Sequence, residues 1–192
     1  MDIFEKYPMV KLITFIISLS DLYGINHSER VAELCMQIGT RISLPPYKLE
    51  DLQLAALLHD IGKLGIPETT RTKPGMLTQA EYWMMQQHTR MGLHIIQQMN
   101  GSIRKTVHNA IYSHHEDWGG TGYPEKLKGE EIPLEARIIR IADTFDAMTH
   151  TRGYRTAFTK QEALNRMMHD QEARQLFDPA LFAIFLAIMA EG

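Results

Sequence analysis

Residues Leu52–Lys63 read LQLAALLHDIGK, and this stretch decides the fold. Its leucines and alanines fill successive turns of a helix, which Asp51 can cap and Gly62 ends. At the end of this apolar helix, the adjacent pair His59-Asp60 offers an imidazole nitrogen and a carboxylate that can bridge two cations. An isolated pair of this kind is more often a helix-terminal histidine stabilised by the helix dipole, beside a solvated aspartate. The interpretation therefore depends on the rest of the chain.

Helical patterns recur on both sides of this stretch, and the sequence shows no alternating strand pattern of useful length. It predicts one all-α domain of about eight helices over residues 1–192. The helices are expected over residues 8–22, 26–42, 51–61, 78–99, 103–115, 134–149, 159–170 and 179–190. Residues 1–20 hold the N-terminal helix, 21–178 the motifs and 179–190 the C-terminal helix. Residues 117–133, with four glycines and two prolines, form a glycine-rich loop before the Asp143 helix.

Cap residues mark three of the predicted helix starts. Thr78 with Glu81 and Thr159 with Glu162 each fit a capping box, in which each side chain bonds the other residue's backbone N–H. Asp178-Pro179 fits an N-cap followed by proline at the first helical position. These residues therefore predict helix starts at three defined positions.

Composition narrows the class of protein. The 192 residues include 20 lysines and arginines against 23 aspartates and glutamates, a formal net charge of −3. This mild acidity argues against binding a nucleic acid polymer, which usually requires a basic surface. The single cysteine, Cys35, excludes an intramolecular disulfide and fits a reducing compartment. The apolar stretch Pro8–Leu19 is shorter than the roughly 20 residues that span a bilayer, and no small-x-small cleavage site follows it. We therefore expect a cytoplasmic protein with no membrane span.

Histidines and aspartates form the most informative pattern in the chain. Five of the nine histidines and two aspartates lie at the ends of predicted elements or on apolar helices: His27, His59, His88, His114, His115, Asp60 and Asp143. A buried carboxylate is costly unless it is paired or bound to a metal. Imidazole and carboxylate ligands suit Mn, Fe or Zn rather than a calcium cage. The other histidines, His94, His108, His150 and His169, are not expected to touch a metal.

The order and spacing of these residues match a known family. The matching elements are His27-x-x-Arg30-Val31, His59-Asp60-Ile61-Gly62-Lys63, His88, His114-His115-Glu116, Gly122-Tyr123-Pro124, Asp143-Thr144-Phe145-Asp146-Ala147-Met148 and Arg152-Gly153-Tyr154-Arg155. This set resembles the HD-GYP subgroup of the HD superfamily of metal-dependent phosphohydrolases. The His-Asp pair is common to the superfamily, whereas the doublet, the Gly-Tyr-Pro loop and the Asp and Arg segments in this order are specific. The resemblance implies a single HD-type helical bundle.

The resemblance also implies an activity. Members of the subgroup hydrolyse the 3′–5′ phosphodiester of cyclic di-GMP to pGpG or GMP, and some cleave the cyclic GMP–AMP dinucleotide. They use divalent cations, here expected to be two, with Fe or Mn as the first candidates, and a water activated between them. The implied metal ligands are His27, His59, Asp60, His88, His114, His115 and Asp143.

The resemblance assigns further roles near these ligands. Asp60 would bridge the two cations, and Lys63 would contact phosphate or protonate the leaving group; Lys63 also fits a plain helix-end lysine. The implied substrate contacts are Lys63, Tyr123, Asp146, Arg152 and Arg155. Tyr123 also fits a packed lid, and Asp146 also fits an ion pair with Arg152. Arg30 is expected to support the site through a carboxylate.

The sequence departs from the subgroup at several positions. Tyr23 stands where some members have a glutamate that holds a third metal, hence the expectation of two. Asp117-Trp118-Gly119 stands where Arg-Trp-Asp is frequent, and Gly153 where proline is frequent. These changes keep two alternatives open. One is a catalytically weak module that binds cyclic di-GMP or a protein partner, and the other is an HD phosphohydrolase for another nucleotide.

The resemblance also predicts binding partners. The small-molecule partner is expected to be a cyclic dinucleotide. The 192 residues leave no room for a sensor domain, so regulation is expected from a separate protein. The apolar segments Pro8–Leu19 and Ala180–Ala190 are the candidate surfaces for that protein or for a homodimer.

Overall fold

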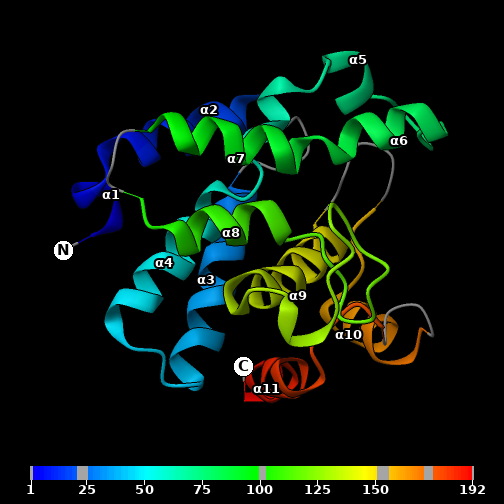
Figure 1. Ribbon diagram of the computed structural model, residues 1–192. Helices are drawn as coiled ribbons and strands as arrows, with labels where there is room; N and C mark the ends of the chain where they lie inside the picture. The colour runs from blue at the N-terminus through cyan, green and yellow to red at the C-terminus, as the bar shows by residue number, and fades with distance from the viewer. Residues whose placement is uncertain (1, 21–25, 100–102, 151–155, 171–174, 192) are drawn as a thin grey trace.

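The computed structural model describes residues 2–20, 26–99, 103–150, 156–170 and 175–191, and within them every regular element is a helix (Figure 1). The elements are α1 (Ile3–Lys6), α2 (Pro8–Ser20), α3 (His27–Arg41), α4 (Pro46–Leu58), the 3-10 helix η1 (Ile61–Gly65), α5 (Glu68–Arg71), α6 (Gln79–Gln86), α7 (His88–Gln98), α8 (Lys105–Ser113), the 3-10 helix η2 (Gly129–Glu131), α9 (Leu134–Thr149), α10 (Lys160–His169) and α11 (Pro179–Glu191). The predicted all-α class is confirmed.

The core lies between α3, α4, α8 and α9. α3 packs against α4 and α9, and α8 packs against the same two helices from the other side. α9, drawn in yellow, passes through the middle of the bundle, with α11 across its lower end (Figure 1). Apolar side chains such as Leu52, Ile111 and Ile139 are fully buried there. Because four helices meet at this core, residues at their ends are brought close together.

Two predicted boundaries differ from the structure. α4 begins at Pro46, not at Asp51, because proline at the first helical position needs no N–H partner. The predicted cap at Asp51 is therefore wrong: this carboxylate is buried inside α4 and pairs with Arg104, 53 residues further along the chain. The helix expected over residues 78–99 is divided at Gln87 into α6 and α7.

The three helix starts predicted from cap residues are confirmed. Both capping boxes are formed, Thr78 with Glu81 and Thr159 with Glu162. The Asp178 carboxylate accepts hydrogen bonds from the first free backbone N–H groups of α11. Within the described part of the chain, no helix is both long enough and apolar enough to cross a membrane.

Gly62 allows η1 to lie directly on α7. A methyl group at this position would lie 1.8 Å from the His88 carbonyl oxygen and 2.5 Å from the Gly92 nitrogen. Both of these are backbone atoms of α7, so they cannot move without displacing the helix. The absence of a side chain at Gly62 therefore brings the His59-Asp60 turn next to His88.

Replacing Gly62 with alanine is expected to lower the free energy of unfolding by at least about 2 kcal/mol, because the added methyl overpacks a backbone contact. Chemical denaturation of the chelator-treated protein measures this without a metal contribution. Gly65→Ala is the matched control on the same element. Its added methyl meets chiefly the flexible Met91 side chain, whose sulfur lies 2.6 Å away. Equal losses for the two variants would contradict the role given to Gly62.

Candidate metal centre

The predicted ligands converge because most of them lie at helix ends. His59 is the C-cap of α4, and Asp60 follows as the N-cap of η1. His27 and His88 are the first residues of α3 and α7, and His114 is the C-cap of α8, followed by His115. Asp143 lies inside α9, on its buried face. The tertiary structure brings all of these side chains together in one cluster.

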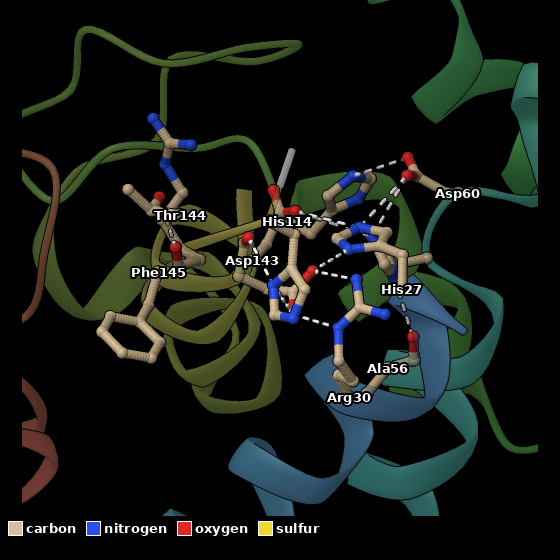
Figure 2. A network of polar contacts seen from close by, with 12 residues as sticks. His27, Arg30, Ala56, Asp60, His114, Asp143, Thr144 and Phe145 are labelled. Carbon is tan, nitrogen blue, oxygen red and sulfur yellow. Dashed lines mark hydrogen bonds and ion pairs between the residues drawn. The ribbon is translucent and has the colours of Figure 1, made fainter. Parts of the chain in front are cut away.

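Asp60 lies at the centre of the cluster, and its two oxygens face different histidines. Oδ1 lies 3.5 Å from His88 Nε2 and 4.0 Å from His114 Nε2. Oδ2 lies 3.3 Å from His59 Nε2 and 3.8 Å from His27 Nε2 (Figure 2). A carboxylate placed in this way can bridge two cations, each held by its own imidazoles.

The ligand atoms form two groups that share Asp60. One group is Asp60, His88, His114 and His115, and the other is His27, His59 and Asp60; within each group the ligand atoms lie within 4.8 Å of one another. Asp143 lies beside the second group, with its Oδ1 3.3 Å from His27 Nε2 and 4.0 Å from His59 Nε2 (Figure 2). The arrangement is consistent with a two-metal site.

Backbone carbonyls orient three of the imidazole rings. The Nδ1 atoms of His59, His88 and His114 each lie 2.7 Å from the carbonyl oxygen three residues earlier in the chain. A carbonyl oxygen can only accept, so each Nδ1 carries the proton and donates it. Each Nε2 then keeps its lone pair and faces Asp60, as a metal ligand requires.

Several polar atoms of the cluster are buried without hydrogen bonds. The atoms are His27 Nε2, His59 Nε2 and Asp60 Oδ1, and none of the described residues satisfies them with hydrogen-bond geometry. Burying such atoms unpaired is unfavourable. Cations between the imidazoles and carboxylates would satisfy all three, so this donor set fits divalent metal ions.

The protonation states also suit metal binding. Burial lowers the pKa values of His88, His114 and His115, which keeps their rings neutral. Burial alone would raise the pKa of Asp60, but the charge of Lys63 and the adjacent His59 ring outweigh it and hold that pKa well below its usual range. The group of Asp60, His88, His114 and His115 therefore combines three neutral imidazoles with an ionised carboxylate.

Comparison with known proteins identifies the family of this chain. A family model described as HD domain matches residues 11–181. This chain belongs to the HD domain family. The chain is 34% identical over 185 residues to a cyclic di-GMP phosphodiesterase of Thermotoga maritima, covering 96% of this chain and 50% of that protein. The predicted family membership is confirmed.

A second relative is named for a different cyclic dinucleotide. A 3′3′-cGAMP-specific phosphodiesterase of Vibrio cholerae is 34% identical over 182 residues, covering 95% of this chain and 42% of that protein. The structure of Bd1817, a HDGYP protein from Bdellovibrio bacteriovorus, matches the fold with a TM-score of 0.70 at 23% identity, covering 86% of this chain and 52% of that one. This chain thus spans about half or less of the length of the two phosphodiesterases.

Two of the predicted substrate contacts lie beside the predicted metal ligands. Lys63 Nζ lies 2.5 Å from Asp60 Oδ2, and its side chain is partly exposed. The half-buried Tyr123 ring stacks on His115, with the ring centroids 4.9 Å apart. Burial raises the pKa of Tyr123, so its hydroxyl stays protonated and can donate a hydrogen bond. Arg152 and Arg155 lie outside the described residues, as does Tyr23.

Asp146 was expected as a substrate contact. It lies on the Nδ1 side of the His27 ring, whereas Nε2 faces Asp60 and Asp143. Its Oδ2 accepts from His27 Nδ1 at 2.6 Å, and Arg30 donates to both oxygens at 2.6 and 2.9 Å. His150 Nδ1 lies 3.0 Å from Oδ1. With these contacts Asp146 orients the His27 ring, and Arg30 balances the charge of the Asp146 carboxylate. Arg30 was expected to support the site through a carboxylate, and Asp146 is that carboxylate.

Asp146→Asn is expected to weaken metal binding by about 10- to 100-fold, because an amide holds the His27 ring less firmly than a carboxylate does. Titration of the metal-free protein with Mn(II) or Fe(II) measures the effect. Asp170→Asn, on the far end of α10, serves as the matched control. Unchanged affinity in Asp146→Asn would show that His27 does not depend on this contact.

Sequence reasoning missed three polar side chains near the site. His150 was not expected to touch a metal, but its contact with the Asp146 carboxylate was missed, although the i,i+4 spacing of the two residues could have indicated it. Glu116 is buried and accepts hydrogen bonds from the Glu125 and Leu127 backbone N–H groups at 2.7 and 3.0 Å. Arg140 pairs with Asp117. The last two contacts join residues that no local pattern connects.

Proposed function

We propose that this HD domain is a metal-dependent phosphodiesterase that hydrolyses the 3′–5′ phosphodiester of cyclic di-GMP to pGpG, GMP or both. The observation that carries the proposal is the central position of Asp60, whose two oxygens face two separate groups of imidazole nitrogens. The relatives named above support a cyclic dinucleotide as the substrate class.

The residues present can hold two cations. His88, His114 and His115 would hold one, His27, His59 and Asp143 the other, and Asp60 would bridge them. Two divalent cations about 3.5–4 Å apart activate a water and stabilise the attacking and leaving oxygens of a phosphoester. Imidazole-rich donors favour Fe or Mn over Mg, which prefers oxygen ligands.

Binding a cation at His27 requires loss of a proton. Burial alone would lower the pKa of His27, but the neighbouring carboxylates of Asp143 and Asp146 favour the protonated ring, outweigh burial and raise this pKa to about 9. At neutral pH the metal-free ring is therefore protonated. Metal binding would displace that proton, so the affinity of the second site is expected to fall as the pH is lowered.

The cations need substrate contacts beside them, and the chain offers several. Lys63 is placed to donate to a phosphate oxygen or to the leaving oxygen. Tyr123, which stacks on His115, would present its hydroxyl or its ring to the dinucleotide. Arg152 and Arg155 would clamp a phosphate through bidentate hydrogen bonds.

The test is anaerobic purification, metal quantification and chromatography of reactions with cyclic di-GMP and with cyclic GMP–AMP, each with added Mn(II) or Fe(II). Product from cyclic di-GMP in protein with about two metals per chain would establish the proposal. Faster turnover of cyclic GMP–AMP would reassign the substrate. Two metals without either product would favour a binding module or another nucleotide. If the protein takes up no metal, the proposed metal site and the activity that depends on it are both wrong.

A separate regulatory protein and a homodimer remain predictions for this domain. The exposed side chains Met9, Leu12, Phe15 and Ile16 form an apolar surface on α2. This surface is the first place to map such contacts.

A further inference from the structure

Asp117 opens the glycine-rich loop and is buried, with several contacts inside that loop. Its Oδ2 accepts from the Thr121 hydroxyl at 3.0 Å, and its carbonyl oxygen accepts from the Gly120 N–H at 2.8 Å. A methyl group at Gly122 would lie 2.3 Å from the Asp117 nitrogen, so the two backbone segments touch. The start of the loop is therefore folded tightly onto itself around Asp117.

Asp117 also connects the loop to α9. Its Oδ1 accepts from Arg140 Nε at 3.1 Å and from Nη2 at 2.8 Å, so two guanidinium nitrogens donate to one oxygen in an ion pair that is largely shielded from solvent. Arg140 lies three residues before Asp143, and His115 lies two residues before Asp117. This pair therefore joins two segments that each carry predicted metal ligands.

The same loop is fixed on its outer side by the segment before α11. The backbone N–H groups of Trp118 and Gly119 donate to the carbonyls of Leu176 and Gln175 at 3.1 and 2.8 Å. A methyl group at Gly119 would lie 3.0 Å from the Gln175 Cβ, so the close approach requires a small residue. The loop is therefore attached to residues 175 and 176 even though Asp117 and Gly119 stand where arginine and aspartate are frequent in the subgroup.

Tyr123 is the last residue of the part of the loop, residues 117–123, that these contacts hold in place. Its N–H donates to the His115 carbonyl at 3.1 Å, and its ring stacks on the His115 ring. We propose that Asp117 is a positioning residue: through Arg140 and Thr121 it holds the loop closed and so fixes Tyr123 beside the metal site. The catalytic consequence rests on the proposed phosphodiesterase function, whereas the anchoring of the loop does not.

Two measurements test this on metal-loaded protein. Asp117→Ala is expected to speed amide hydrogen exchange in residues 116–128 and to raise KM for cyclic di-GMP by about 10-fold or more, with metal content unchanged. Asp117→Asn, which keeps the size of the side chain, should show the same changes to a smaller degree and serves if the alanine variant does not fold. Glu125→Gln is the control. Glu125 lies in the same loop, and its exposed carboxylate contacts Arg90 of α7 and the Tyr112 hydroxyl of α8; a glutamine oxygen can accept both hydrogen bonds, so neither quantity is expected to change.

A double-mutant cycle separates positioning from a general structural role. If Asp117 acts through Tyr123, Asp117→Ala should raise KM no further in a Tyr123→Ala background. Additive effects, or wild-type hydrogen exchange in both Asp117 variants, would overturn the inference. If the wild-type domain shows no turnover, the proposed function fails, and hydrogen exchange still decides whether Asp117 anchors the loop.

Discussion

Asp60→Ala is expected to lose both metal ions and essentially all turnover. Asp60 belongs to both ligand groups, so its removal takes one ligand from each cation and the bridge between them. Two-metal stabilisation of a phosphoester transition state is worth several kcal/mol, which corresponds to a loss of at least about 1,000-fold in kcat/KM. Metal content should fall from about two per chain to fewer than one.

Metal analysis, turnover and thermal unfolding of the same preparation measure this effect. In the wild-type domain, added metal should raise the melting temperature, because a ligand that binds the folded state stabilises it. In Asp60→Ala that shift should disappear. His108→Ala, which replaces an α8 histidine outside both ligand groups, is the control and should retain metal and activity. Full metal content in Asp60→Ala would show that the ligand assignment is wrong.

Lys63→Ala is expected to keep both metals and to lower kcat by about 100-fold. The ammonium lies 2.5 Å from Asp60 Oδ2, at the partly exposed edge of the cluster, where a substrate phosphate can reach it. It contributes a proton or a charge-assisted hydrogen bond, and general acid catalysis is typically worth about 100- to 10,000-fold.

Lys63→Arg distinguishes the two roles. Arginine keeps the positive charge and the hydrogen-bond donors but does not release a proton, so it restores activity only if Lys63 acts as a phosphate contact. Lys6→Ala is the control, since it breaks a comparable lysine–carboxylate contact, with Glu50, far from the cluster. Loss of metal in Lys63→Ala would instead mean that the lysine stabilises the ligand cluster itself.

Helix boundaries show where local patterns were sufficient. The capping boxes at Thr78 and Thr159 and the cap at Asp178 involve residues two or three positions apart, so the sequence displays them directly. Asp51 was misread as a cap because the side chain that neutralises it belongs to Arg104, the N-cap of α8. Short-range contacts can be read from spacing, whereas burial of a charge depends on which helix packs over it.

The candidate site divides in the same way. The sequence by itself determined the helical class and the set of histidines and aspartates, because their residue types and spacing express metal chemistry and helical periodicity. The tertiary structure decided which imidazoles face which oxygen of Asp60. It also placed Asp146 behind His27, 119 residues away in the chain, and Asp117 against Arg140. These contacts form when helices pack in three dimensions, and no local pattern of residues encodes which side chains then meet.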